Sequence, residues 1–238
     1  METKLKMVKS GSIIEFFNYK NGWLNYGSRP KNINKKYYPK KSLSASSIRY
    51  QKQLKLQRLI NSNAYISKAS PKLLTLTYKQ NQTNLQLSKS DFNDFLQRLN
   101  YQTNSQLKYI AVPEFQKRGA VHFHTILLNV PYLPQDKIYS CWGKGFIKIN
   151  RIDRINNVGV YMSKYLSKSP SSFNKKSYLS SQGLNFPIID YNESSNRVIY
   201  NAIPSRCCIA RGSYKTEFQG LVESSVFKLP LFDKGIKI

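Results

Sequence analysis

Acidic residues, cysteines and long apolar runs are all scarce in this chain of 238 residues. Its three cysteines, Cys141, Cys207 and Cys208, do not make a disulfide framework, and this usage favours a reducing cytoplasm. No stretch approaches the roughly 18 consecutive apolar residues that a membrane span needs. Near the N-terminus, Glu15 interrupts the first apolar stretch, so we expect no signal peptide and no membrane partner.

The sequence also lacks the Gly-x-x-x-x-Gly-Lys-Ser/Thr motif of phosphate-binding loops. Gly143-Lys144-Gly145 does not supply it, because the motif requires a longer glycine-rich loop. We therefore expect no nucleotide cofactor and no built-in helicase.

Positive charge is abundant. The chain has 38 Lys and Arg against 12 Asp and Glu, which gives a formal net charge of +26 and a pI near 10.0. Such an excess favours a polyanionic partner, because each phosphate that a basic side chain neutralises releases condensed counterions. Nucleic acid is the expected partner, and the 17 tyrosines offer rings for stacking on unpaired bases. A basic surface that merely faces solvent remains an alternative.

Basic residues concentrate in the first sixty positions, which hold fourteen Lys or Arg and two acidic residues, including the basic run from Lys35 to Lys41. We interpret residues 1–60 as a basic arm that ends in a helix over residues 42–61. A more regular pattern follows. Residues 65–190 are therefore predicted to form the main domain, and residues 191–238 a C-terminal extension.

The predicted main domain mixes strand and helix signals. Leu73–Tyr78 alternates as a strand does, and a helix is predicted at the capping box Ser88-x-x-Asp91. Further strands are predicted at residues 107–115, 121–130 and 145–151, a short helix within 134–142, and a helix over 155–169. Consecutive antiparallel strands with helices packed mainly on one face make an α+β fold with an antiparallel central sheet.

The only two histidines lie two positions apart, at His122 and His124, inside a predicted strand. Alternate residues of a strand share a face, so both imidazoles can point at one spot. If the hairpin turns about Arg118, Glu114 lies across from His122 on that face.

Two histidines and one carboxylate with open positions suit Mg²⁺, Mn²⁺ or another divalent cation, whereas closed zinc sites prefer four ligands. The expected metal ligands are therefore Glu114, His122 and His124. Two further outcomes are open: a bulge at Pro113 would turn Glu114 away, and a His-x-His pair can simply be buried in a strand.

The last predicted helix of this domain carries Tyr161 and Tyr165, four residues apart, with Lys164 and Lys168 beside them. A tyrosine hydroxyl, with an ordinary pKa near 10, needs help to attack a phosphodiester. The lysines can lower the cost of a phenolate or hold a phosphate, although two tyrosines at this spacing also occur as simple packing residues.

Three motifs together resemble the HUH endonuclease superfamily. They are Leu73–Tyr78 (LLTLTY), Glu114–His124 (EFQKRGAVHFH) and Tyr161–Lys168 (YMSKYLSK). In this order they are similar to the two-tyrosine replication initiators of rolling-circle plasmids and small single-stranded DNA phages. The resemblance covers roughly residues 45–190 and implies a ferredoxin-like or RRM-like central sheet.

The resemblance implies that a tyrosine attacks a phosphate in single-stranded origin DNA, which leaves a 5′-phosphotyrosine and a free 3′-OH. Tyr165 would be the indispensable nucleophile and Tyr161 its alternate, assisted by Mg²⁺ or Mn²⁺. The residues expected to contact phosphate or DNA are Lys164, Lys168, Arg118, Thr75 and Thr77. Expected partners are a host helicase and a DNA polymerase, in the cytoplasm of a bacterial cell.

Alternatives remain at the level of sequence. A transposase of the same superfamily would use identical chemistry on transposon ends, whereas mobilisation relaxases usually place the tyrosine before the histidine motif. A noncatalytic RNA-binding protein would also suit the charge and the tyrosines, but the chain lacks an RNP1-type stretch and this alternative leaves the histidine pair unexplained.

Overall fold

The computed structural model describes residues 4–20, 44–64, 71–150, 152, 157–168, 177–216 and 220–230. The chain divides into two compact units. Residues 49–186 form one unit, and residues 1–48 together with 187–238 form the other. Within the described residues, no helix is both long and apolar enough to cross a membrane.

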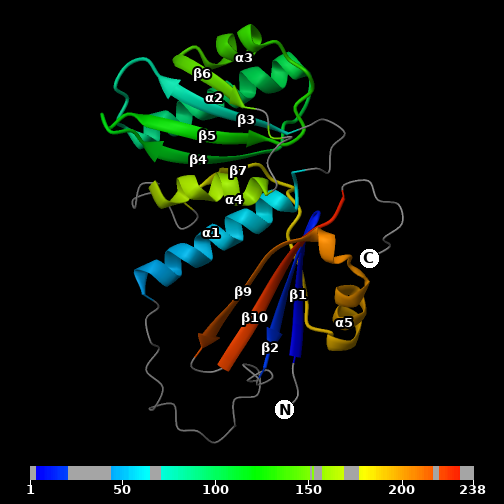
Figure 1. Cartoon of the computed structure of the whole chain (residues 1–238). Coiled ribbons are helices and arrows are strands. Elements are labelled where there is room, and N and C mark those ends of the chain that lie inside the picture. Colours follow the sequence, from blue (N-terminus) through cyan, green and yellow to red (C-terminus); the bar gives the residue numbers. More distant parts are fainter. Residues whose placement is uncertain are drawn as a thin grey trace, which may run out of the picture. The chain divides into compact units, whose positions relative to one another are not determined.

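The unit of residues 49–186 is built on a five-stranded antiparallel sheet in the order β6-β3-β5-β4-β7 (Figure 1). The strands are β3 (Lys72–Tyr78), β4 (Tyr109–Phe115), β5 (Val121–Leu127), β6 (Gly145–Asn150) and β7 (Leu179–Ser180). The α+β class and the antiparallel central sheet are therefore confirmed.

Helices cover both faces of this sheet rather than mainly one (Figure 1). One face packs against α2 (Leu85–Thr103) and α3 (Gln135–Trp142), and the other against α1 (Ala45–Asn61) and α4 (Val158–Ser163). The reason lies in the strands, which carry apolar residues on both sides: Leu74 and Leu76 belong to the first core, Leu73 to the second. A sheet that is apolar on both faces has to be covered twice.

The second helix begins three residues before the predicted capping box. Asn84 is its N-cap, and its side chain accepts hydrogen bonds from the backbone nitrogens of Gln86 and Leu87. Ser88 is buried inside the helix, where its hydroxyl donates to the Asn84 carbonyl. Asp91 instead accepts a hydrogen bond from the Tyr78 hydroxyl at 2.9 Å. A capping box and a within-helix pair share the same spacing, which explains the shift.

The hairpin of β4 and β5 has the predicted register, with Glu114 paired to His122. Pro113 pairs with Phe123 in an unbroken ladder, so it does not introduce a bulge. Proline is tolerated there because β7, the other neighbour of β4, pairs only with Ile110 and Ala111.

The predicted helix over residues 155–169 is split. The α-helix α4 covers Val158–Ser163, and a 3₁₀ segment, η1, continues over Lys164–Lys168. Residues 153–156 and 169 lie outside the described residues, as does Arg151 at the end of the predicted strand 145–151.

The other unit contains a second five-stranded antiparallel sheet, in the order β8-β1-β2-β10-β9. Its strands are β1 (Lys4–Ser10), β2 (Ile13–Tyr19), β8 (Ile188–Asp190), β9 (Cys208–Thr216) and β10 (Gly220–Lys228), with α5 (Glu193–Ala202) and a 3₁₀ turn, η2 (Ser205–Cys207). Phe16, Phe227 and Met7 lead its core, against which α5 packs Ile199 and Tyr200.

This second sheet differs from the predicted division into a basic arm and a C-terminal extension. Residues 4–20, placed in the arm, form two strands, and β2 pairs with β10 from the other end of the chain. The basic run from Lys35 to Lys41 lies outside the described residues.

Candidate active site

The candidate metal ligands occupy adjacent rows on one face of the sheet of residues 49–186. In one row, β4 Glu114, β5 His122 and β3 Thr77 are paired neighbours. In the next row, β5 His124 pairs with β3 Thr75. Paired residues of antiparallel strands project to the same side, so the fold brings these five side chains together.

His124 is held at both ring nitrogens. Its Nε2 donates to Glu114 Oε2 at 2.7 Å, and Thr75 Oγ1 lies 3.4 Å from its Nδ1. Both partners of the His124–Glu114 contact are largely buried, with side chains 10% and 14% exposed. Such contacts fix the orientation of an imidazole ring.

His122 differs from His124 in having an unsatisfied nitrogen. Its Nε2 is buried and has no hydrogen-bond partner among the described residues. Burial, followed by the charge of His124, lowers the pKa of His122 to about 4, although Glu114 acts in the opposite direction. His122 is therefore a neutral imidazole at neutral pH, which is the form that ligates metals.

The donor set fits a divalent cation in chemistry, but its side chains presently bond to one another. Glu114 Oε2 is engaged with His124, and the rings of His122 and His124 are 6.2 Å apart. Among the described residues, no three His, Cys, Asp or Glu side chains are already arranged as metal ligands. The unpartnered Nε2 of His122 is the observation that favours a missing ligand at this face.

Tyr165 lies directly on the histidine face. Its ring stacks on that of His124 with centroids 3.5 Å apart and an interplanar angle of 11°. Its hydroxyl donates to the Tyr161 hydroxyl at 3.4 Å. Burial, the hydrogen bond to Tyr161 and the charge of Glu114 all raise the pKa of Tyr165. In this arrangement Tyr165 is a neutral phenol, and its activation requires additional positive charge.

Lys164 supplies some positive charge beside the two phenols. Its Nζ lies 3.7 Å from the centroid of the Tyr161 ring and 5.0 Å from that of Tyr165. An ammonium over an aromatic face is attracted by the ring quadrupole. The side chain of Lys168 lies outside the described residues.

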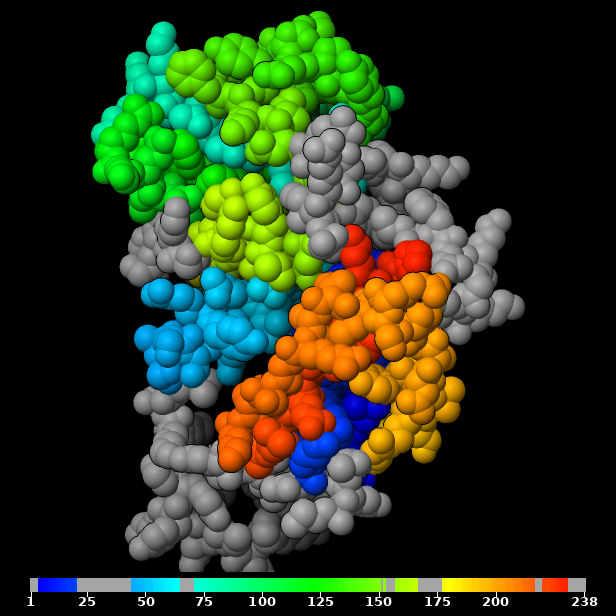
Figure 2. Space-filling model, in the orientation of Figure 1, coloured from blue at the N-terminus to red at the C-terminus, as the bar shows by residue number. Residues whose placement is uncertain are grey.

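The tyrosine segment is positioned by α1. Asn61 Oδ1 accepts a hydrogen bond from the Gly159 nitrogen at 2.9 Å, and Gln57 Nε2 donates to Ser163 Oγ at 2.9 Å. At Gly159 the two helices are so close that a Cβ would lie 2.3 Å from the Gln57 carbonyl oxygen. The space-filling view shows the yellow-green surface of α4 against the blue surface of α1 (Figure 2).

Arg118 lies in the hairpin turn and does not face the tyrosines. Its guanidinium donates to the carbonyl oxygens of Tyr78 and Lys79 at the end of β3, and its Nε donates to Gln116 Oε1 at 3.0 Å. These contacts brace the turn. The expected contact of Arg118 with DNA stays a prediction.

Two side chains on the histidine face were missed at the level of sequence. Phe146 pairs with Thr77 and Lys148 with Thr75, so both β6 side chains join the rows of the candidate ligands. The alternation in the segment Gly145–Asn150 was visible, but nothing local showed that this strand pairs with β3.

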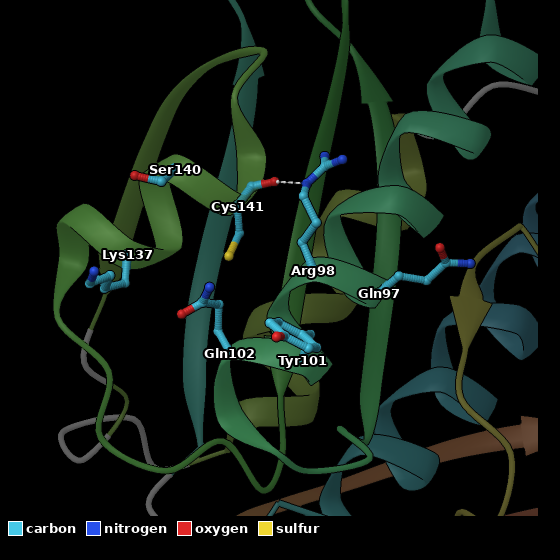
Figure 3. A pocket seen from close by; sticks show the side chains of 7 residues that line it. All are labelled: Gln97, Arg98, Tyr101, Gln102, Lys137, Ser140 and Cys141. Carbon is cyan, nitrogen blue, oxygen red and sulfur yellow. Dashed lines mark hydrogen bonds between the residues drawn. The ribbon is translucent and has the colours of Figure 1, made fainter.

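A pocket of about 390 Å³ lies elsewhere, between α2 and α3 (Figure 3). Its lining comprises Gln97, Arg98, Tyr101, Gln102, Lys137, Ser140 and Cys141. None of these was predicted as a site residue, and both helices cover the sheet face opposite to the histidines. The pocket is therefore separate from the candidate active site.

Residues 71–170 match the family model of the replication-associated proteins of the ORF2 type. These residues belong to that family. The match spans β3, the histidine hairpin and the tyrosine segment, and confirms the predicted resemblance to replication initiators at the level of the family. This replication-associated domain covers less than half of the chain. No curated protein and no solved structure matches the chain.

Proposed function

We propose that the chain nicks and rejoins single-stranded DNA at a replication origin through a 5′-phosphotyrosine intermediate, and so starts rolling-circle replication. The match to the replication-associated family supports a role in DNA replication. The observation that carries the chemistry is the stacking of Tyr165 on His124 at 3.5 Å. It puts a phenol beside side chains whose donor atoms suit a divalent cation.

In the proposed reaction, the Tyr165 oxygen attacks the phosphorus atom. A bond forms between tyrosine and the 5′-phosphate while the bond from phosphorus to the 3′ oxygen breaks. The leaving oxygen takes up a proton and becomes a free 3′-OH. The phosphotyrosine conserves one phosphoester bond, so a later 3′-OH can displace the tyrosine and rejoin the strand without ATP.

The remaining side chains have supporting roles in this proposal. Tyr161, within hydrogen-bond distance of Tyr165, is the alternate nucleophile for a second cleavage. Lys164, close to both rings, stabilises a phenolate or holds a phosphate, since an amine near DNA phosphates stays protonated.

Glu114, His122 and His124 would hold the cation, Mg²⁺ or Mn²⁺. When bound, the cation supplies Lewis-acid polarisation of the non-bridging phosphate oxygens. The carboxylate and His124 would give up their mutual contact, and the buried His122 Nε2 would gain a partner. A host helicase and a DNA polymerase would open the duplex and extend the 3′-OH.

The test is to incubate the chain with labelled single-stranded oligonucleotides that tile the DNA encoding it, with Mn²⁺ or Mg²⁺. We expect a covalent protein–DNA adduct that survives denaturation and disappears with EDTA. Tyr165→Phe should remove most of the adduct, because it keeps the stacked ring but deletes the attacking oxygen. The double change Tyr161→Phe, Tyr165→Phe should remove all of it, and so should His122→Ala.

Tyr132→Phe is the matched control, because Tyr132 is an exposed tyrosine in neither motif and should leave the adduct unchanged. The proposal fails if the wild type forms no adduct, or if cleavage persists in both the double variant and His122→Ala. A transposase would give the same adduct, so the neighbouring DNA, an origin hairpin or paired transposon ends, distinguishes the two roles.

A further inference from the structure

Strand β6 contributes two side chains to the active-site face that have no part in the proposed chemistry. Two rows cross the sheet there: Phe146, Thr77, His122 and Glu114 form one, and Lys148, Thr75, His124 and Val112 form the other. Neighbouring strands lie about 4.8 Å apart, so β6 is about 10 Å from β5. Phe146 and Lys148 therefore lie beside the candidate ligands.

The exposure of Phe146 is not explained by packing. Its side chain is 62% exposed, although the other large apolar residues of this face belong to a core. That core includes Leu73, Ile110 and Ile126, which lie further along the strands, beyond the two histidine rows. The apolar cover of this face thus ends before Phe146, which leaves an exposed ring beside polar side chains.

The backbone holds Phe146 in place. At the preceding residue, Gly145, a Cβ would lie 2.3 Å from the Thr77 carbonyl oxygen, so β6 approaches β3 as closely as a glycine allows. The same oxygen accepts a hydrogen bond from Trp142 Nε1 at 3.1 Å, and the Lys79 nitrogen donates to the Lys144 carbonyl at 3.0 Å. The start of β6 is therefore fixed before any ligand binds.

We propose that Phe146 and Lys148 form a binding subsite for single-stranded DNA next to the scissile phosphate. A base stacks on the Phe146 ring, and the Lys148 ammonium contacts a backbone phosphate. Exposed aromatic rings interleaved with basic side chains are the usual means of binding single strands. The net charge of +26 favours a polyanion over an apolar partner. This inference rests on the proposed function, which places the scissile phosphate at the histidines.

The subsite is tested by binding without cleavage. The probe is a fluorescent oligonucleotide of twenty thymidines, titrated in EDTA and followed by anisotropy. Phe146→Ala should weaken binding about tenfold, because stacking of a base on an aromatic ring contributes on that order. Lys148→Gln should lower the slope of log affinity against log salt by about 0.7, the value for one phosphate contact on a single strand.

Tyr101→Ala is the control, because Tyr101 is 86% exposed but lies on α2, which covers the opposite face of the sheet. It should bind like the wild type. The subsite is refuted if Phe146→Ala binds as tightly as the wild type, or if Tyr101→Ala loses as much affinity. Phe146→Leu keeps the apolar bulk without the ring. Its affinity should fall nearly as far as that of Phe146→Ala while its thermal stability stays that of the wild type.

The adduct assay separates this inference from the proposed function. Phe146→Ala retains both tyrosines and all three candidate ligands, so saturating DNA should restore its cleavage rate while its KM rises. If the wild type forms the adduct and Phe146→Ala has an unchanged KM, the subsite fails and the proposed function stands. If the wild type forms no adduct, the proposed function fails whatever the binding data show.

Discussion

His122 is the residue at which burial and chemistry conflict most strongly. A buried imidazole nitrogen without a partner forfeits the hydrogen bond it would make in water, and native structures contain few such groups. His124, two residues away, has contacts at both of its ring nitrogens. The asymmetry is expected of a site in which one ligand is already oriented and the other awaits its ion.

The depressed pKa of His122 predicts how stability depends on pH when no metal is bound. Its pKa is about 4 in the folded chain and about 6.5 in an unfolded one. Between these values the unfolded state binds a proton that the folded state does not, so stability falls as pH drops from 6.5 towards 4.

We expect the wild type in EDTA to lose more stability between pH 7 and pH 5 than His122→Gln, whose side chain does not titrate. Urea unfolding at both pH values measures the difference, and the carboxyl titration that both proteins share cancels. Equal losses in the two proteins would show that His122 does not carry this pH dependence.

Part of the site could be predicted because it is local. The two-residue period of a strand puts His122 and His124 on one face, and a symmetrical hairpin turn about Arg118 sets Glu114 opposite His122. Phe146 and Lys148 could not be found in this way. Their position depends on which strand β6 pairs with, and that pairing crosses about seventy residues of sequence.

The tyrosine-bearing element is too short to be stable by itself. The α4 helix has six residues, and isolated helices of fewer than about 12 residues are marginal in water. Its position therefore depends on its contacts with α1, made through Asn61, Gln57 and the close approach at Gly159.

Gly159→Ala should displace the tyrosines. The new Cβ would lie 2.3 Å from the Gln57 carbonyl oxygen and 2.8 Å from Asn61 Oδ1, so α4 has to move away from α1. We expect a loss of about 1–3 kcal/mol in the free energy of unfolding, typical of overpacking, and a larger proportional loss of adduct formation.

Gly212→Ala is the matched control, since the nearest atom to its Cβ would be Ser224 Oγ at an ordinary 3.6 Å. It should leave both stability and adduct formation near wild type. Wild-type stability and activity in Gly159→Ala would show that α1 does not set the position of the tyrosines.

At the scale of elements, the sequence predicted those helices and strands whose pattern is local. The strand at Leu73–Tyr78 and the short helix before Trp142 are present as β3 and α3. Boundaries were less predictable. Asn84 competes with Ser88 as a cap, and the tyrosine helix tightens to a 3₁₀ turn at Lys164. Such choices depend on tertiary contacts that a sequence window does not contain.

At the scale of the whole chain, the second sheet was not predicted, and the reason is sequence separation. Its central strand β2 pairs with β10, about two hundred residues away, with Phe16 opposite Ser225. The alternation of β2 is readable, but its partner is not. An N-terminal segment rich in lysine also has the composition of a flexible arm, and that composition outweighed the strand pattern in the prediction.

The two units have separate cores, and this predicts separate responses to core truncation. Phe16 is buried in one core, with its ring 5.1 Å from Tyr200, and Phe95 is buried in the other, 5.9 Å from Trp142. Replacing a buried phenylalanine by alanine typically costs about 3–5 kcal/mol. Phe16→Ala should therefore weaken the sheet of β1, β2, β9 and β10 and spare the sheet of β3, β4 and β5, whereas Phe95→Ala should do the reverse.

Hydrogen exchange resolved by peptide measures this directly, because amide protection reports the opening of each unit. In Phe16→Ala, faster exchange should be confined to residues 4–20 and 188–228, and adduct formation should persist, since every proposed catalytic residue lies in the other unit. In Phe95→Ala, faster exchange should appear in residues 72–127, and adduct formation should fall. Loss of protection throughout both sheets in either variant would show one cooperative unit, in which the replication-associated domain depends on the paired ends of the chain for its stability.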